Sequence, residues 1–477
     1  MSNRESTAGT AVITGATSGI GRSYAEALAA AGHDLLLTGR RSEKLGLPEV
    51  VAMGVGGMVS GGIYAVLGVA MRQAGNAVPL SYLIAGIITL LTAYSYLKLT
   101  FHFGEHAGAF TFVEHATDNL HVAGFVGWVL VVGYVGVMAM YAFAFGAYSL
   151  TAARAVVGVE LPQLLRPIIS VLVVAAFVGL NLSGVQETGL FEDIAVYIKV
   201  LVLLSLAGLG IALYNGDPTA MDFFNRGHLS PITGFAIIFV SYEGFQLLVY
   251  DYEDIENAER TLPIGMYTSI VIAILIYVAV SFMATLQLTP EQLIAHEETA
   301  LAAAVSNIPL LGAAGFVLVM LSAIKSTSSG INATLFGTSR LVHEIATEGV
   351  IPRLFSFRDR EGIPVYALLL MGGLTAAFAA LGTLKQITEF GSVAFLIADA
   401  VANAVNFQLA DTTGSNRLFP ALGLVGTVAA IPIVLYHLYR TDLGILLWIV
   451  GLFCSLFLFE FIYIERRPYD AGSEAGA

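Results

Sequence analysis

Apolar runs of about 20 residues recur along this chain from Val50 to Ile464, separated by short polar breaks. A helix needs about 20 apolar residues to cross the hydrocarbon core of a bilayer, so these runs constrain the fold more than any other feature. The composition agrees, because 57% of the 477 residues are hydrophobic and 12% are charged, against about 25% in typical soluble domains. We therefore expect an all-α integral membrane protein.

Counting these runs predicts about twelve transmembrane helices. The predicted spans cover residues 50–72, 78–99, 121–149, 166–187, 190–214, 231–250, 263–287, 308–343, 364–384, 386–410, 418–437 and 442–464. In this arrangement most of the 22 lysine and arginine residues fall on the side of the N terminus. Because positive residues accumulate on the cytoplasmic side, we expect a multi-pass protein of the cell membrane with both termini in the cytoplasm.

Charge and cysteine content exclude several other classes. The net charge is −13 and no basic cluster is dense, so we expect no nucleic-acid partner. Cys454 is the single cysteine, which rules out an internal disulfide and a thiolate metal site. The histidines between the second and third spans lack the spacing of metal ligands, so we expect no metal site.

Residues 1–46 have a different pattern from the rest of the chain. Residues 11–14 and 34–38 predict two short strands, and residues 22–31 predict a helix between them. The turn after the first strand is rich in glycine, with Gly15, Gly19 and Gly21. This segment resembles the start of a short-chain dehydrogenase/reductase.

In that family the glycines let the backbone approach a dinucleotide pyrophosphate, and basic residues such as Arg40 and Arg41 suit a 2′-phosphate. The resemblance ends within residues 1–46, and two strands with one helix bury too little surface for independent stability. We therefore expect a truncated, nonfunctional extension that binds no cofactor. The alternative is a membrane-tethered NADP-dependent oxidoreductase. That alternative requires the rest of a nucleotide-binding fold, which the sequence lacks.

The first span contains five glycines within residues 54–62. Each glycine in a helix interior costs about 1 kcal/mol relative to alanine, so this cluster favours an interruption of the helix. An interruption frees N–H and C=O groups, which is tolerable in a membrane where they face a cavity or a ligand. The alternative is close helix packing through small residues.

The sixth span has a matching irregularity. Ser241, Glu243 and Gly244 interrupt an apolar run, and residues 250–254 end it with an acidic stretch. If the first ten spans form two inverted five-helix repeats, the first and sixth spans occupy equivalent places. Interrupted helices at equivalent places predict a substrate site near the middle of the membrane.

These motifs, together with residues 260–263 and 332–340, resemble the amino acid–polyamine–organocation (APC) transporter superfamily over residues 47–467. The resemblance implies a five-plus-five inverted-repeat core with interrupted first and sixth helices, two further C-terminal helices and alternating access. Residues 468–477 are then a C-terminal tail. It also implies a substrate whose carboxylate meets N–H groups of the first span and whose ammonium group meets carbonyl groups of both interrupted helices.

The implied substrate contacts can be placed on this chain. The carboxylate falls to the backbone of Ser60, Gly61 and Gly62, beside the positive end of the following half-helix. The carbonyl contacts and the side chains that line the site are predicted at Val55, Gly56, Phe239, Ser241, Tyr242, Glu243 and Phe245. An aromatic residue in an apolar span also has a plainer explanation, which is packing.

Lys199 lies well inside the fifth span, where a lysine is expensive unless it is paired or neutral. The resemblance implies that its ammonium group replaces the ion held by sodium-coupled relatives. The alternative is an extended lysine that reaches the membrane surface. Ser328 and Ser329 are candidates for the same coupling site or for helix packing, and Lys325 and Asp399 depart from the family pattern. Lys325 and Asp399 could pair with each other or face a water-filled path.

We therefore expect a secondary transporter of amino acids or related amines that is coupled to protons or works by exchange. Its expected partners are a small-molecule substrate, protons and the lipid bilayer. The alternatives are a sodium-coupled transporter of the same fold and a receptor or channel built on it.

Overall fold

The computed structural model describes residues 11–14, 35–38, 44–104, 108–117, 119–183, 189–217, 221–359 and 362–465. The chain forms two compact units, Met1–Gly46 and Leu47–Ala477.

Two short strands lie in the first unit. Strands β1 (Ala11–Thr14) and β2 (Leu35–Thr38) pair in parallel, with Ala11 opposite Leu35. They coincide with the two predicted strands, whereas the predicted helix at residues 22–31 and the glycine turn lie outside the described residues.

The second unit is helical in its described part. Its first helices are α2 (Leu47–Met58), α3 (Val66–Ala74), α4 (Val78–Phe103), α5 (Ala109–Thr117), α6 (Leu120–Val157), α7 (Leu165–Leu182), α8 (Gly189–Ala212) and α9 (Ser230–Ile238). The later ones are α10 (Leu247–Tyr250), α11 (Ala258–Gln287), α12 (Pro290–Ala295), α13 (Ala300–Ser306), α14 (Gly312–Thr347), α15 (Val365–Leu381), α16 (Leu384–Gln408), α17 (Ala410–Thr413), α18 (Leu418–Thr441) and α19 (Leu443–Glu465).

Local sequence explains where several helices begin. Asn119 accepts hydrogen bonds from the N–H groups of His121 and Val122 at the start of α6. Thr289 and Thr383 each form a capping box with a glutamine three residues later, at the starts of α12 and α16. Such caps satisfy N–H groups that a helix leaves without internal partners.

Ten helical stretches in the described part of the chain are long and apolar enough to cross a membrane, and two shorter apolar helices are Leu47–Met58 and Val365–Leu381. This is two fewer than the twelve spans predicted. The first span is divided, and its second half, α3, continues into α4 as one helical stretch, Val66–Phe103. The predicted span at residues 364–384 is the short helix α15, which has 17 residues. The chain is therefore a multi-pass membrane protein, whereas the number twelve and the inverted repeat remain predictions.

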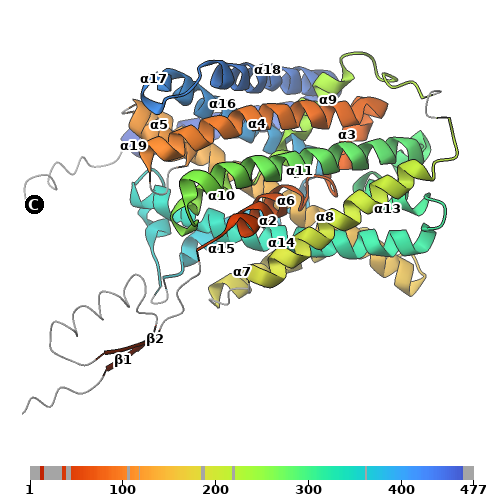
Figure 1. Ribbon diagram of the computed structural model, residues 1–477, viewed down its shortest axis with the longest axis horizontal. Helices are drawn as coiled ribbons and strands as arrows, with labels where there is room; N and C mark the ends of the chain where they lie inside the picture. Colours follow the sequence, from red (N-terminus) through yellow and green to blue (C-terminus); the bar gives the residue numbers. More distant parts are fainter. Residues whose placement is uncertain are drawn as a thin grey trace, which may run out of the picture. The chain divides into compact units, whose positions relative to one another are not determined.

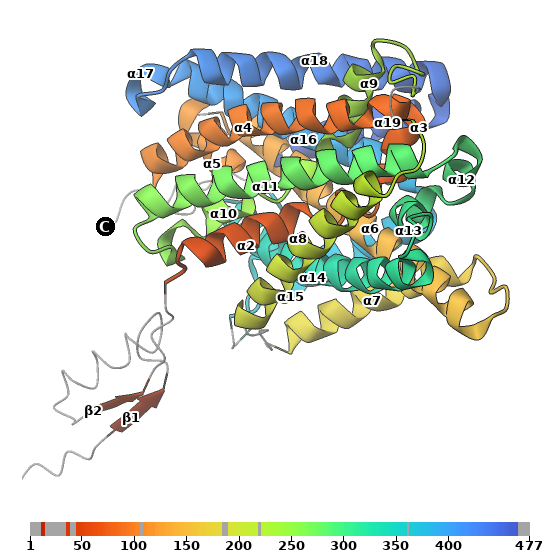
Figure 2. The same ribbon diagram turned by 45° about the vertical axis from the view of Figure 1, so that its right-hand side comes forward.

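The helices of the second unit lie roughly side by side. Figures 1 and 2 show α18, α4 and α11 in succession, with α14 and α7 beyond them and α8 crossing obliquely. Helix α6 lies at the centre and packs against α14, α16, α7 and α15. Helix α2 packs against α11, α8 and α14, so the first span is enclosed by other helices.

Burial separates the core helices from the outer ones. Large apolar side chains on the outer helices are exposed, including Leu201 on α8 (67%) and Val425 on α18 (66%). Side chains of α6 and α16 are mostly buried. Exposed apolar surface of this extent suits contact with lipid.

Both predicted interruptions are present. Helix α2 ends at Met58 and α3 begins at Val66, so residues 59–65 are not helical. The sixth span consists of α9, a 3₁₀ turn at Phe239–Tyr242 and the short helix α10. The non-helical segments fall where the sequence has its glycine cluster and its Ser-Tyr-Glu-Gly stretch.

Candidate binding site

The two interrupted helices meet backbone to backbone. Gly244 has a φ of +120°, and a Cβ atom placed there would lie 2.8 Å from the carbonyl carbon of Gly57. A Cβ atom on Gly57 would in turn lie 3.3 Å from the Cα atom of Gly244. Glycine is therefore required at Gly244, both for its φ and for this approach.

Hydroxyl groups from neighbouring helices satisfy carbonyl groups freed by the first interruption. The donors and acceptors are Tyr141 to Gly57 (2.9 Å), Tyr277 to Met58 (2.7 Å), Ser326 to Val59 (3.4 Å), Tyr82 to Gly62 (3.1 Å) and Tyr148 to Tyr64 (3.0 Å). These bonds replace the intrahelical partners that the chain loses where α2 ends.

Three N–H groups of the same segment, unlike those carbonyl groups, lack a hydrogen-bond partner within the described structure. The backbone N–H groups of Ser60, Gly61 and Gly62 have no hydrogen-bond acceptor in the part of the chain that the structure describes. They precede α3, whose first turn carries the positive end of a helix dipole. The segment therefore offers free donors beside satisfied acceptors, an arrangement that suits an anionic group.

The predicted carbonyl acceptors already have partners. The carbonyl of Val55 accepts from the N–H of Val59 (2.9 Å), and that of Gly56 accepts from the hydroxyl of Ser60. The carbonyl of Ser241 accepts from Tyr277 (2.7 Å). A carbonyl oxygen has two lone pairs, so each can still accept one further donor.

The aromatic residues of the sixth span are packed tightly. The Tyr242 hydroxyl donates to the carbonyl of Tyr82 (2.8 Å), and its ring meets that of Tyr277 edge-on. Phe245 is fully buried with its ring against Tyr96. These two side chains hold the interruption in place. Ser241, by contrast, has a buried hydroxyl with no partner among the described residues.

Lys199 lies beside the first interruption. Its side chain is 8% exposed, and its Nζ atom donates to Ser326 on α14 (3.0 Å), whose hydroxyl donates to the carbonyl of Val59 (3.4 Å). The chain of contacts links α8, α14 and the first span. Sequence reasoning placed the coupling hydroxyls at Ser328 and Ser329 instead.

Those two serines have other contacts. Ser328 donates to the carbonyl of Lys325 on its own helix (2.8 Å), and Ser329 donates to Glu192 on α8 (2.5 Å). Lys325 is exposed, whereas Asp399 is fully buried, and no ion pair joins them within the described ranges. The suggested pairing of Lys325 with Asp399 is therefore absent from this structure.

A comparison with known families decides the class of the protein. The amino acid permease family matches residues 45–468 of this chain. The chain belongs to the amino acid permease family.

Relatives of the permease come from all three domains of life. It is 29% identical to an uncharacterized protein of Methanocaldococcus jannaschii over 90% of this chain and 98% of the relative. It is 26% identical to the inner membrane transport protein YbaT of Escherichia coli, over 86% and 94% of the two chains. It is 27% identical to the mitochondrial cationic amino acid transporter 3 of Arabidopsis thaliana, over 75% and 60%.

The family match indicates a transporter rather than an enzyme. It begins at residue 45, so the strands β1 and β2 lie outside it. The resemblance of that N-terminal segment to a dehydrogenase therefore gains no support.

Three tyrosines of the permease site escaped sequence reasoning. Tyr82 on α4, Tyr141 on α6 and Tyr277 on α11 all donate to the interrupted helices. Each lies in an apolar span without a surrounding motif, so only a polar ring in the middle of a span could have marked it.

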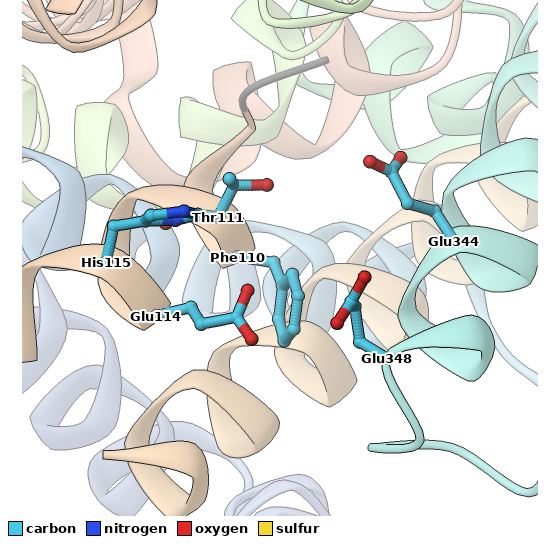
Figure 3. A pocket seen from close by; sticks show the side chains of 6 residues that line it. All are labelled: Phe110, Thr111, Glu114, His115, Glu344 and Glu348. Carbon is cyan, nitrogen blue, oxygen red and sulfur yellow. The ribbon is translucent and has the colours of Figure 1, made fainter. Parts of the chain in front are cut away.

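A separate pocket of the permease lies at the ends of α5 and α14. Figure 3 shows Phe110 between the carboxyl groups of Glu114, Glu344 and Glu348, with Thr111 and His115 beside it. The pocket has a volume of about 350 Å³. Burial raises the pKa of Glu114 above its ordinary value, the nearby Glu348 adds to this rise and His115 opposes it.

Proposed function

We propose that this permease carries an amino acid or a related amine across the cell membrane by alternating access, driven by protons or by exchange. The observation that carries the proposal is the set of free N–H groups at Ser60, Gly61 and Gly62, next to carbonyl groups that hydroxyls already satisfy. Unpaired backbone donors are costly in a membrane unless a ligand completes them. A carboxylate is the part of an amino acid that fits such donors.

Acceptors for the ammonium group lie on the sixth span, next to Gly62. The carbonyl of Ser241 has one lone pair left, and the Ser241 hydroxyl has no partner in the described structure. Gly57 contacts Gly244 at the crossing, which brings both interruptions together. A compact molecule with a carboxylate and an ammonium group could therefore bridge them.

The names of relatives agree with this class. Three related proteins of Arabidopsis thaliana are named cationic amino acid transporters. An amino-acid-like substrate is therefore the proposal for this chain, without a choice of side chain.

Coupling is assigned to Lys199. A charged Nζ atom, linked through Ser326 to the carbonyl of Val59, would hold α14 against the first interruption much as a bound cation could. Loss of its proton removes that charge. A sodium-coupled mechanism would place an ion where this ammonium group lies, so the two mechanisms exclude each other at this position. Ser328 and Ser329 follow Ser326 on α14 and remain secondary candidates for the coupling site.

Uptake into proteoliposomes tests the proposal. A panel of amino acids is compared with matched analogues in which the carboxylate is amidated or the amine is acetylated. We expect transport of at least one parent compound, and a large loss with both analogues. Each compound is tested with an inward proton gradient, with a sodium gradient, and by counterflow with neither. Equal transport of the amidated analogue would refute the carboxylate contact, and a strict sodium requirement would refute the role of Lys199.

A cysteine label tests the proposed cytoplasmic location of both termini. Cys454 is the only native cysteine, and replacing it by alanine provides a background for single cysteines at Ser2 and Ala477. In intact cells neither should react with a membrane-impermeant thiol reagent until the membrane is opened. Labelling of either cysteine in intact cells would place that terminus outside the cell and contradict the predicted orientation.

A further inference from the structure

Two buried carboxyl groups lie in the core of the permease outside the contacts described above. Glu243 follows the interruption of the sixth span and is 1% exposed, and Asp399 on α16 is fully buried. A buried carboxylate needs a partner of opposite charge or several hydrogen bonds, because the interior solvates charge poorly.

Hydrogen bonds from separate donors hold the two groups. The amide nitrogen of Gln246 donates to Oε2 of Glu243. The N–H of Gly244 donates to Oε1 of Gln246 (3.0 Å), which fixes the amide so that its donor side faces Glu243. Asp399 accepts a hydrogen bond from the hydroxyl of Tyr96 (3.2 Å), whose ring packs edge-on against Phe245 of the sixth span. We call Glu243 and Asp399 the acid pair.

Each member of the acid pair keeps one oxygen atom without a donor. Among the described residues, Oε1 of Glu243, Oδ2 of Asp399 and the hydroxyl of Tyr134 on α6 have no hydrogen-bond partner. Tyr134 is 1% exposed, and its ring centroid lies 5.1 Å from that of Phe395, one turn before Asp399 on α16. Three buried polar atoms in this part of the core therefore lack a partner.

No positive charge compensates the acid pair in the described part of the protein. The titratable groups around it are tyrosines, namely Tyr96 on α4, Tyr134 and Tyr141 on α6, and Tyr250 on α10. The charged group that acts on Glu243 is Asp399 itself. Two adjacent buried carboxylates cannot both stay ionised without a cation, so at least one proton is needed.

A proton satisfies this arrangement with no added volume. A protonated carboxyl group is a donor as well as an acceptor, so one proton lets the acid pair form the hydrogen bond that its free oxygens lack. Aspartic proteases hold a proton between two carboxyl groups for the same reason.

A line of polar side chains begins one turn beyond Asp399 and runs to the end of α16. Asn403 lies one turn beyond Asp399, accepts from Ser95 on α4 (2.7 Å) and donates to Thr92 (2.9 Å). Asn406 donates to Ser95 (3.3 Å). Its carbonyl oxygen accepts from Thr413 (3.1 Å) and Ser415 (2.8 Å), which are partly exposed just after α16.

We propose that the acid pair of Glu243 and Asp399 is a proton-binding site, separate from Lys199, which takes up and releases its proton through the polar line between α4 and α16. The proposal rests on the proposed transport function. Glu243 belongs to the interrupted sixth span, next to Gly244 at the crossing with Gly57, whereas Asp399 belongs to a continuous helix. Movement of the sixth span therefore changes the distance between the two carboxyl groups and with it the affinity for the proton.

Counterflow of a transported substrate, measured across pH without an imposed gradient, tests the acid pair in the full-length protein. Asp399→Asn removes the negative neighbour of Glu243, so Glu243 ionises more easily. The proton concentration for the half-maximal pH effect should rise on the order of tenfold, which corresponds to one pH unit. Tyr96→Phe removes a donor that favours ionised Asp399, so the effect should move in the opposite direction.

Glu389→Gln is the matched control. Glu389 is also buried on α16, but its neighbour is Lys385, 3.9 Å away, and it lies ten positions before Asp399, about 15 Å along the helix. This variant should keep the pH profile of the wild type.

Infrared difference spectra provide a readout that needs no substrate. The carbonyl band of a protonated carboxylic acid should change between acidic and alkaline buffer in the wild type and in Glu389→Gln, and should be lost or shifted in Asp399→Asn. An unchanged band and an unchanged pH profile in Asp399→Asn would overturn the proposal. The proposal would also be overturned if Asp399→Asn lost transport only of substrates with a cationic side chain, and did so at every pH. The acid pair would then bind the substrate rather than a proton. Because the band is recorded without substrate, failure of all transport would count against the proposed function alone.

Discussion

The Nζ atom of Lys199 on α8 lies 3.0 Å from the hydroxyl oxygen of Ser326 on α14, at a position where Lys199 is only 8% exposed. The hydroxyl of Ser326 in turn donates to the carbonyl of Val59. One hydroxyl group therefore links the ammonium group of Lys199 to the first interruption.

We predict that Lys199→Ala abolishes accumulation against a gradient but leaves exchange, because the charge that ties α14 to Val59 is lost. Lys199→Arg should hold one state permanently, since arginine keeps its proton. The measurement is uptake with and without a proton gradient. Lys325→Ala is the control, because Lys325 is exposed on the same helix as Ser326. Gradient-driven accumulation of wild-type size in Lys199→Ala would assign coupling elsewhere.

A second prediction concerns the free N–H groups. A Cβ atom on Gly62 would lie 2.3 Å from the hydroxyl of Tyr277 and 2.5 Å from the carbonyl of Ser241. Gly62→Ala should therefore separate the two interruptions and lower substrate affinity by tenfold or more, on the order of 1.4 kcal/mol. Gly337→Ala is the control, since its Cβ atom would meet a side chain at an ordinary 3.6 Å. Binding of labelled substrate to purified protein is the assay, and equal affinities for both variants would argue for simple packing.

The hydroxyl of Tyr277 leads to a stability prediction. Its oxygen lies 2.7 Å from the carbonyl oxygens of both Met58 and Ser241, and its single proton is shared between these two acceptors. Tyr277→Phe leaves these buried acceptors without that donor and should destabilise the protein by about 1–3 kcal/mol. Tyr134→Phe removes a hydroxyl that has no partner in the described structure, so the melting temperature should barely change. Equal melting temperatures for the two variants would contradict a stabilising role of the Tyr277 hydroxyl.

The pocket at α5 predicts a pH effect of known sign. Burial and then Glu348 raise the folded-state pKa of Glu114 above 4.5, so the folded state binds protons more readily than the unfolded one. Stability from this group is therefore gained as the pH falls through the raised value and lost as the pH rises. Glu114→Gln should raise the melting temperature slightly at neutral pH and weaken its dependence on pH above 4.5.

Glu291 at the start of α12 is a control of opposite sign. Hydrogen bonds from its own backbone N–H and from Thr289 lower the pKa of Glu291, so its contribution is present above 4.5 and is lost as the pH falls through the lower value. Glu291→Gln should slightly lower the melting temperature at neutral pH. A change of the same sign in both variants would show that the two pKa shifts do not govern the effect.

The N-terminal unit should be dispensable. It contains two short paired strands in its described part, and the family match begins only at residue 45. Deleting residues 1–44 should leave membrane insertion and uptake within about twofold of the intact protein, an effect below 1 kcal/mol. NADPH titration of the intact protein checks the alternative, because a micromolar affinity that is lost on Gly19→Asp would mean that the segment binds a dinucleotide.

The sequence by itself determined the membrane class, the approximate spans and the places where two helices are interrupted. These follow from local properties: apolar length sets what can cross a bilayer, and clustered glycines weaken a helix wherever they stand. Lys199 was also marked by sequence, because a lysine deep in an apolar span is rare for an energetic reason.

Only the tertiary structure decided which side chains complete those features. Ser326, rather than Ser328 or Ser329, reaches Lys199, because a helix turns by about 100° per residue and a shift of two positions faces another neighbour. The hydroxyl of Tyr277 on α11 joins carbonyls that lie 219 and 36 positions away along the chain. Asp399 lies near the sixth span, through Tyr96 and Phe245, for the same reason: contacts between distant helices depend on how the bundle packs, and no local pattern encodes that packing.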